Sequence, residues 1–436
     1  NSESGIVASN RTPLVWPNLE KLPNWKILKP TSSTNPTSSE GCSGCATKDH
    51  LYVFGGGNEN GQNAQLFQLS SVSSTNPSWQ LIEPQSSNAA ASSSTSTTTT
   101  SRIQPSPRTG ASLVSNGQQT LYLFGGLSAL DGEWYNDVHM FDCEKKQWTV
   151  LFANRKETDQ LTQVPSVRDK CALCFVPSSN CLLLFGGFGP IKEVEDDNDS
   201  DDPIVDADSD VPTATFGWSS TVWSFDLVKL EWTLHTCKGE MPQGRAGHSM
   251  VYVESQNCAF VFGGRDPQRR NNDLYRLDLQ QFEWKRMSPR GKHPLPRSSH
   301  GAVVLNGDGP HPRMVIWGGK DATENANDLN DLHIYDITTD AYFQPAFEEE
   351  ESTIKGRGFF ACMQHNHVMY VYGGSSDFDP ETGNVTTYHD TLLSLDLSPI
   401  AKALEPEIVE PTQNETTTTT QTEIDTSGFA IPPSDD

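Results

Sequence analysis

Short apolar runs that end in a pair of glycines recur along the chain. One such run occupies 121–124, and Gly125 and Gly126 follow it directly. The pattern occurs six times, with the first glycine at positions 55, 125, 186, 263, 318 and 373. The intervals range from 55 to 77 residues, and the longer ones contain inserts of unusual composition. A recurrence with a period of roughly 50 residues indicates one supersecondary unit repeated along the chain.

Each repeat has the pattern of four short strands. A segment such as 245–251 precedes the glycine doublet, and an Asp-bearing segment such as 274–278 follows it. An aromatic residue comes six residues after that aspartate, as Trp284 follows Asp278. These segments are rich in β-branched and aromatic residues, which favours strands. Because the run before the doublet lacks polar alternation, we expect a strand covered on both faces. Its two glycines permit positive φ and the close approach of a neighbouring backbone.

Six four-stranded units bury their sheet faces when they are arranged about an axis. We therefore predict an all-β fold, a six-bladed β-propeller. The pattern resembles the kelch repeat over about residues 40–400. The segment 24–28 resembles the fourth strands of the repeats, whereas the last repeat has Lys402 where an aromatic residue is expected. We expect Trp25 to lie on the outer strand of the last blade, which would close the ring and cover an exposed edge. The alternative is that 23–29 is a loop.

Composition divides the chain into a propeller and peripheral segments. We expect the kelch propeller over 23–404, after an N-terminal extension at 1–22. It contains a Ser/Thr-rich low-complexity insert at 87–101 and an acidic insert at 191–212, and a Thr/Glu/Pro-rich tail occupies 405–436. These inserts and the tail have too few apolar residues to form a core, which predicts disorder. We interpret the acidic insert as a solvated loop rather than as a metal site.

Net charge and cysteine content narrow the classes of partner. The formal net charge is −25, which argues against binding to nucleic acid or to an anionic membrane. No apolar run is long enough to predict a membrane span. The nine cysteines are scattered through predicted strands, which favours a reducing compartment, the cytoplasm or the nucleus. Four Asn-x-Ser/Thr sequons leave a secreted location open: Asn10, Asn198, Asn384 and Asn414.

No metal ion or other cofactor is expected. The Cys-x-x-Cys pairs at 42–45 and 171–174 have zinc-like spacing. Residues three apart on a strand point to opposite faces, however, so we interpret both pairs as core residues. His248 and His300 occupy equivalent places in two repeats and are interpreted as interior packing residues. We therefore expect a binding module rather than an enzyme.

Arginine recurs at the start of the first strand in five repeats. The five residues are Arg108, Arg168, Arg245, Arg297 and Arg357. One interpretation is that each arginine holds a turn between blades through backbone carbonyls. The other is that the arginines form a positive mouth that suits an anionic or carboxylate-bearing ligand. A further basic cluster follows the fourth glycine doublet, in the loop 265–273. A solvated loop is the alternative interpretation of that cluster.

Several of these segments together resemble the kelch-domain-containing protein 2 group. They are Asp169 with Lys170, the segment 185–189, Gly217 with Trp218, the loop 265–273, and Arg297 with Ser298. Members of that group are substrate receptors of cullin-2 ubiquitin ligases and bind the C-terminal diglycine of target proteins. The resemblance implies that a terminal carboxylate is gripped by Arg265, Arg270 and Ser298. It implies that the pocket is completed by Lys170, Phe188 and Trp218.

Two departures limit what this resemblance implies. Phe188 stands where the group has a tyrosine, so one hydroxyl hydrogen bond is lost. The Leu-x-x-x-Cys element of the group's ligase-binding box is not found after Cys362, so recruitment of a cullin ligase does not follow from this sequence. The alternative function is a scaffold that binds a folded partner, such as a small GTPase or a cytoskeletal protein, through the wide propeller face. That function needs none of the pocket residues.

Overall fold

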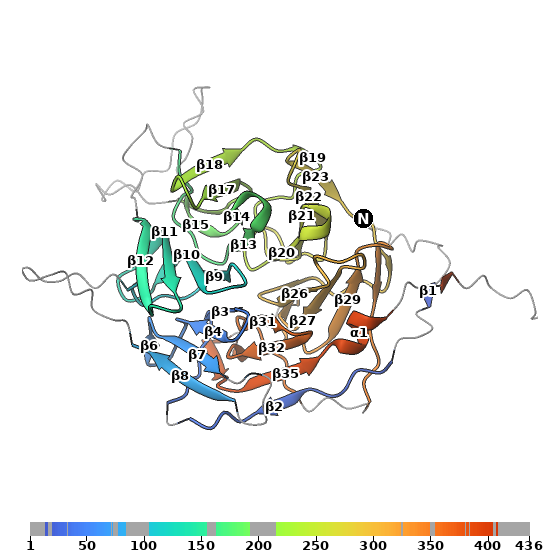
Figure 1. Ribbon diagram of the computed structural model, residues 1–436, viewed down its shortest axis with the longest axis horizontal. Coiled ribbons are helices and arrows are strands. Elements are labelled where there is room, and N and C mark those ends of the chain that lie inside the picture. The colour runs from blue at the N-terminus through green and yellow to red at the C-terminus, as the bar shows by residue number, and fades with distance from the viewer. Residues whose placement is uncertain are drawn as a thin grey trace, which may run out of the picture.

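Six twisted sheets are arranged around a central channel, as the six glycine doublets predict (Figure 1). The computed structural model describes residues 14–15, 20–32, 34–70, 72, 77–83, 104–154, 163–191, 215–323, 326–348, 354–379, 381–382, 384–403 and 407–408. The predicted inserts and tail therefore lie largely outside the described residues: all of 87–101, 192–212 and 409–436. None of the helices in the described part is long and apolar enough to cross a membrane.

The first three blades each have four strands. Blade 1 consists of β3 (Ser43–Ala46), β4 (Leu51–Phe54), β7 (Leu66–Ser70) and β8 (Ser78–Ile82). Blade 2 consists of β9 (Ser112–Ser115), β10 (Thr120–Ser128), β11 (Glu133–Asp142) and β12 (Gln147–Phe152). Blade 3 consists of β13 (Ala172–Val176), β14 (Cys181–Phe185), β17 (Val222–Asp226) and β18 (Glu231–His235).

Blades 4 and 5 each gain a short parallel strand on the outer edge. Blade 4 consists of β20 (Ser249–Val253), β21 (Cys258–Phe262), β22 (Leu274–Asp278), β23 (Glu283–Arg286) and the added β19 (Lys238–Gly239). Blade 5 consists of β26 (Gly301–Leu305), β27 (Arg313–Trp317), β29 (Leu332–Asp336), β30 (Ala341–Phe343) and the added β24 (Arg290–Gly291). Each added strand belongs to the segment that leaves the preceding blade, so the link between blades covers an edge that would otherwise be exposed.

Blade 6 contains both ends of the ring. It consists of β31 (Ala361–His365), β32 (Val368–Tyr372), β35 (Leu392–Asp396) and β2 (Lys26–Leu28). β2 pairs antiparallel with β35, with Ile27 opposite Leu393, and Figure 1 shows the blue β2 beside the red β35. The predicted closure by an N-terminal strand is therefore confirmed. A short helix, α1 (Ser398–Lys402), follows β35.

One aromatic pair joins each blade to the blade before it. In every blade the aromatic residue on or beside the outer strand packs on the aromatic residue that directly precedes the glycine doublet of the preceding blade. Ring centroids lie 4.9 to 6.3 Å apart in the pairs Trp79 with Tyr372, Trp148 with Phe54, Trp232 with Phe124, Trp284 with Phe185, Tyr342 with Phe262 and Trp25 with Trp317. Trp25 thus supplies the aromatic residue that the last repeat lacks, and each tilted or edge-to-face pair stabilises one interface between blades.

Each glycine doublet makes room for the backbone of the next blade. All twelve glycines have positive φ, from 66° to 106°. A Cβ on Gly125 would lie 2.7 Å from the carbonyl oxygen of Arg168, and a Cβ on Gly55 would lie 2.8 Å from that of Arg108. The second glycine donates its N–H to the same carbonyl oxygen, as Gly126 does to Arg168 at 2.9 Å. The predicted close approach of a neighbouring backbone is confirmed.

The five recurrent arginines tie consecutive doublets together. Each is buried and donates from Nη1 to the carbonyl oxygen of the first glycine of its own blade, over 2.9 to 3.2 Å. Three of them also form buried ion pairs: Arg108 with Asp137, Arg245 with Asp273, and Arg297 with Asp331. The interpretation that these arginines hold turns between blades is therefore confirmed. The interpretation that they form a positive mouth is wrong, because their guanidinium groups are buried in the blades and donate hydrogen bonds to the glycine carbonyls there.

A closed ring of main-chain hydrogen bonds surrounds the channel. One residue per blade takes part, with φ between 49° and 66°, and these residues are Gly41, Gly110, Lys170, Gly247, Ser299 and Phe359. The N–H of each residue donates to the carbonyl oxygen of its counterpart in the preceding blade, over 2.7 to 3.0 Å. Because Gly41 donates to Phe359, the ring is complete, and it fixes the position of every first strand around the axis.

In blades 4 and 5 the residue after the ring residue is a histidine that packs against the glycine doublet of the preceding blade. A Cβ on Gly186 would lie 2.4 Å from Cε1 of His248, and a Cβ on Gly263 would lie 3.0 Å from Cε1 of His300. In blade 6 the same place is taken by Phe360, which approaches Gly318. The structure therefore confirms that both histidines are interior packing residues.

We predict that Gly186→Ala destabilises the propeller more than Gly132→Ala. Both glycines have positive φ, 70° and 62°, but Gly132 has nothing within 4 Å of an added Cβ. Gly132→Ala should therefore show only the cost of the left-handed conformation, about 1–2 kcal/mol. Gly186→Ala adds a clash with the Arg245 carbonyl and with His248 and should cost about 1–3 kcal/mol more. Urea unfolding of both variants measures the difference. Equal losses would contradict the packing described for the doublet.

We also predict that His248→Phe flattens the pH dependence of stability. Burial, followed by the charge of Arg245, lowers the pKa of His248 to about 3, and neither ring nitrogen has a hydrogen-bond partner among the described residues. The unfolded chain binds a proton at this histidine below about pH 6.5 while the folded chain does not, so stability falls as the pH decreases. The variant should lose about 2 kcal/mol less free energy of unfolding between pH 7 and pH 5. Urea titrations at the two pH values measure this, and identical slopes for variant and wild type would contradict it.

Candidate functional site

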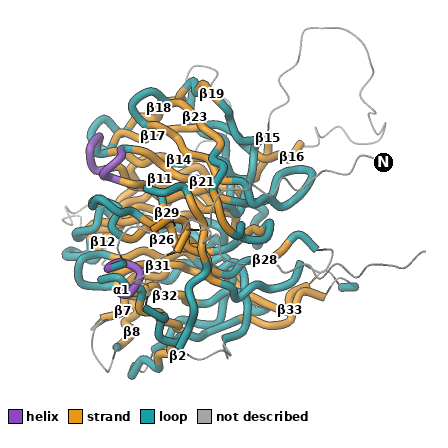
Figure 2. Tube along the Cα trace, turned by 90° about the vertical axis from the view of Figure 1, so that its right-hand side faces the viewer, coloured by secondary structure: helices purple, strands orange, loops and turns teal. Residues whose placement is uncertain are grey.

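The channel mouth at the glycine-doublet end carries several short two-stranded sheets, three of which are hairpins. They are β5 (Gly57–Asn58) with β6 (Gly61–Gln62), β15 (Phe188–Ile191) with β16 (Thr215–Trp218), β25 (Arg297–Ser298) with β28 (Lys320–Asp321), and β33 (Ser375–Asp379) with β34 (Asn384–Tyr388). In Figure 2, β15, β16, β28 and β33 project on one side of the molecule, and α1 lies on the opposite side. All six site residues predicted from the sequence lie in or beside these two-stranded sheets and the channel ring.

The loop after the fourth doublet is shaped by Asp266. Its Oδ1 accepts hydrogen bonds from the main-chain N–H groups of Gln268 and Arg269, both at 2.8 Å. Its Oδ2 accepts a bond from the side-chain amide of Asn271 at 2.9 Å. This Asx-type turn folds the loop back on itself, and Arg265 becomes the antiparallel bridge partner of Arg270. Two arginines that are five positions apart in sequence are thereby held side by side.

Arg270 is connected to the start of blade 5 through Ser298. The Nε of Arg270 donates a hydrogen bond to Oγ of Ser298 at 2.9 Å. Ser298 is buried, and Arg270 is half-buried. Since the serine oxygen accepts this bond, its own O–H remains able to donate to a ligand. The structure thus brings Arg265, Arg270 and Ser298 together at the boundary of blades 4 and 5.

The described part of the chain offers the two arginines no carboxylate partner. Within the described ranges, no residue forms an ion pair with Arg265 or Arg270, whereas Lys320 beside them is paired with Asp328 at 2.6 Å. Burial, and then the neighbouring charge of Arg265, lower the pKa of Arg270, against the attraction of Asp321. The oxygens of Asp321 already accept bonds from Thr323 and Asn327. The pair therefore presents positive charge that nearby carboxylates leave uncompensated.

Phe188 and Trp218 form an aromatic wall on blade 3. They are cross-strand partners in the β15–β16 hairpin, and their ring centroids lie 4.8 Å apart. The backbone of the hairpin abuts the entry to blade 4, because a Cβ on Gly244 would lie 2.1 Å from the Trp218 carbonyl oxygen. Two residues after Gly244, Ala246 pairs through its main chain with Arg265. The wall and the basic pair thus stand on adjacent blades.

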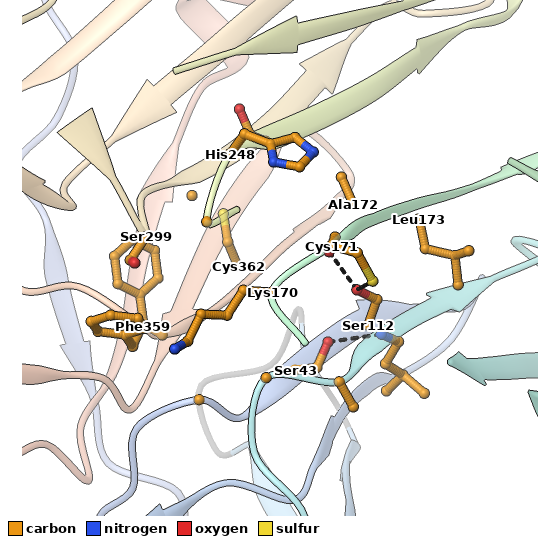
Figure 3. A pocket seen from close by; sticks show the side chains of 18 of the residues that line it. Ser43, Ser112, Lys170, Cys171, Ala172, Leu173, His248, Ser299, Phe359 and Cys362 are labelled. Carbon is orange, nitrogen blue, oxygen red and sulfur yellow. Dashed lines mark hydrogen bonds between the residues drawn. The ribbon is translucent and has the colours of Figure 1, made fainter. Parts of the chain in front are cut away.

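Lys170 belongs to the channel ring and extends over the mouth of the channel. Its Nζ lies 3.4 Å from Oδ2 of Asp169 and 5.5 Å from the ring centroid of Phe359 on blade 6. Figure 3 shows Lys170 beside Phe359 and Ser299. These three residues help to line a cavity of about 240 Å³ along the channel. Main-chain bonds link Lys170 to the aromatic wall and to the basic pair. Asp169, next to Lys170, bridges to Phe188, and Gly247 donates its N–H to the Lys170 carbonyl.

Burial affects Asp169 as well. It raises the pKa of this carboxyl group despite the ammonium group of Lys170, and one carboxyl oxygen has no hydrogen-bond partner among the described residues. No group of three or more His, Cys, Asp or Glu residues in the described ranges has the geometry to hold a metal ion. The mouth is thus a mixed surface of cations, aromatic rings and main-chain groups.

Two further aromatic residues were not identified from the sequence. Trp134 lies 5.9 Å from Phe188 and 5.8 Å from Phe216, and Phe216 stacks on Phe188 at 6.0 Å, all measured between ring centroids. Trp134 follows the second glycine of its doublet by eight residues. Trp218 would follow its own doublet by the same interval if 192–214 were removed. The acidic insert therefore concealed the equivalence of the two tryptophans.

The chain is similar to several known kelch proteins. Kelch domain-containing protein 1 from Mus musculus is 30% identical over 259 residues, which are 59% of this chain and 59% of that protein. Kelch domain-containing protein 2 from Bos taurus is 28% identical over 265 residues, again 59% of each chain. The match thus spans about three fifths of the length of these relatives. A solved structure of YjhT has a TM-score of 0.54 at 15% identity and covers 83% of this chain and 96% of that chain, which shows the fold alone.

A family model accounts for nearly the whole propeller. The KLHDC2/KLHL20/DRC7 Kelch-repeats domain matches residues 8–199 and 210–399. The match includes every glycine doublet and the predicted site residues on blades 3 to 5. Together with the six-bladed fold, it shows that this chain belongs to the KLHDC2/KLHL20/DRC7 family of kelch-repeat proteins.

Proposed function

We propose that this propeller is a non-enzymatic protein-binding module that captures the free C-terminus of a partner polypeptide. The observation that carries the proposal is the pair Arg265 and Arg270, which has no carboxylate partner within the described ranges. Five other arginines form ion pairs with aspartates of the described ranges: Arg108, Arg245, Arg276, Arg297 and Arg313. A positive pair that has no carboxylate partner within the described ranges is suited to an anion supplied by a ligand.

A peptide carboxylate fits the donors of this site. Guanidinium groups present paired N–H donors that match the two oxygens of a carboxylate. The hydroxyl of Ser298, fixed by Arg270, adds a neutral donor. A carboxylate that loses hydration in a recess needs such charge-assisted partners, because an unpaired buried charge is costly. Lys170 adds a further positive charge at the channel mouth.

The aromatic wall explains a preference for small terminal residues. Phe188 and Trp218 stand on blade 3 next to the basic pair and are both half-buried. Rings this close to a bound main chain would leave space for glycine and exclude larger side chains. Phe188 offers no hydroxyl, so selection at this wall would rest on shape. A partner ending in Gly-Gly is therefore the ligand that the site fits best.

The proposal extends to the cellular role that the resemblance implies. A receptor for C-termini could present its partner to a cullin-RING ubiquitin ligase, as members of the kelch-domain-containing protein 2 group do. Such a partner would be met in the cytoplasm or the nucleus, the reducing compartments that fit nine free cysteines. The mouth itself supplies only recognition of the terminus, and delivery to a ligase would be a separate property.

We predict that binding of a Gly-Gly-ended peptide requires both its free carboxylate and Arg265. Amidation of the peptide, or Arg265→Glu in the protein, should each weaken affinity by at least about 30-fold, because a desolvated charge pair is lost. Calorimetric titration measures the affinities. Arg269→Glu is the matched control, because Arg269 lies in the same loop, is exposed, and donates its Nε to Asn271 at 3.3 Å. It should weaken binding no more than about threefold.

Other outcomes would decide against the proposal. If the acid and the amide bind equally well, the site does not recognise a carboxylate. If neither peptide binds while a folded partner still binds the Arg265→Glu variant, the wide propeller face is the functional surface and the scaffold function is the better account. Thermal unfolding of each variant checks that the loop substitutions leave the propeller folded.

A further inference from the structure

We infer that Phe216 and Trp134 form a second subsite, which binds an apolar side chain of the partner about three or four residues before its C-terminus. This inference rests on the proposed function, because it assumes that the terminal carboxylate lies at Arg265 and Arg270. Neither aromatic residue belongs to the site that the resemblance implies. Their placement comes from the two hairpins that project beyond blades 2 and 3.

The two hairpins hold four aromatic rings in one continuous column. β16 carries both Trp218 and Phe216, and side chains two apart on a strand lie on the same face. β15 places Phe188 opposite Trp218, and Phe188 also stacks on Phe216 with an interplanar angle of 20°. Trp134, opposite Leu127 in the β10–β11 hairpin of blade 2, packs on both phenylalanines. Every ring is therefore held by at least one other ring.

The outer end of this column is exposed. Phe216 is 47% exposed, and it is the one aromatic side chain in the described ranges that falls in the exposed class. Its aromatic neighbours are half-buried. The aromatic residues that precede the glycine doublets are, in contrast, fully buried and join neighbouring blades. An aromatic ring that stacks in a column and ends in solvent is suited to extend that stack onto a ligand.

The spacing of the column sets the position of the ligand side chain. On β16, Trp218 is the residue nearer to the glycine doublet. Phe216 lies two residues further out, a separation of about 6.7 Å along the strand. An extended peptide advances by the same distance in about two residues. If the last two residues lie against Phe188 and Trp218, the side chain beside Phe216 and Trp134 belongs to the third or fourth residue from the end.

The chemistry of the aromatic column indicates which kind of ligand side chain it binds. Aromatic faces favour apolar and aromatic side chains, and burial of such a group on binding is favourable in proportion to the area removed from water. The column is continuous with the basic pair through the Trp218 backbone, which abuts Gly244 at the entry to blade 4. The inferred partner therefore has an apolar residue followed by small residues and a free carboxylate.

The test compares two peptides that end in Gly-Gly with a free carboxylate, one with Trp and one with Ser at the fourth position from the end. Fluorescence anisotropy of labelled peptides gives the affinities for wild type, for Phe216→Ser, and for the control Val228→Ser, which removes an apolar side chain that is 79% exposed elsewhere on blade 3. Wild type and the control should bind the Trp peptide about tenfold more tightly than the Ser peptide. Phe216→Ser should reduce this preference to about twofold or less while the dependence on the free carboxylate is retained.

The outcomes separate this inference from the proposed function. Equal affinity of wild type for the two peptides, with binding still lost on amidation, would overturn the second subsite and leave the carboxylate site in place. A tenfold preference that Phe216→Ser does not change would also overturn the subsite. Undiminished affinity of wild type for the amidated peptides, or of Arg265→Glu for the peptides with a free carboxylate, would overturn the carboxylate site instead. Phe216 is exposed, so its variant should unfold at the wild-type temperature, and thermal unfolding checks this.

Discussion

The closed ring of main-chain hydrogen bonds around the channel is the constraint on which the rest of this propeller depends. Each neutral bond contributes only about 0.5–1.5 kcal/mol, but the ring holds one residue of every blade at the same place around the axis. With the first strands fixed, the arginine two residues before five of the six ring residues reaches two consecutive glycine doublets, and an aromatic pair fills each interface between blades. Closure by β2 matters for the same reason, since without it Trp317 would lack Trp25.

The same constraint explains why the candidate site stands out. The arginines that recur in the kelch repeats form structural bonds. Arg108, for example, donates to the Gly125 carbonyl and forms an ion pair with Asp137. Arg265 and Arg270 fall outside that pattern, in a loop that Asp266 folds into a turn, and among the described residues neither a glycine doublet nor an aspartate pairs with their side chains. A function can be argued from these two residues because the recurrent arginines of the repeats already have structural roles.

Local patterns predicted the fold well because each feature of a kelch blade is short-range in sequence. The six doublets, the aspartate and the aromatic residue six positions later were enough to predict blades, and the match of 24–28 to other outer strands predicted closure. The role of Arg108 needed a distant partner, because Asp137 is 29 positions away and no local spacing connects the two. Two interpretations of the arginines therefore remained open until the structure showed their burial.

The candidate site was predicted less completely. The resemblance supplied six residues, and the structure brings Arg265, Arg270 and Ser298 into one group and Phe188 and Trp218 into another. Phe216 was missed because the acidic insert separates the two halves of the β15–β16 hairpin in sequence, and the same insert concealed the equivalence of Trp134 and Trp218.

A crystal structure of the chain with a Gly-Gly-ended peptide would test the account most directly. We predict the terminal carboxylate within hydrogen-bond distance of both guanidinium groups and of the Ser298 hydroxyl. A peptide bound with its carboxylate in solvent, or bound away from the channel mouth, would contradict it.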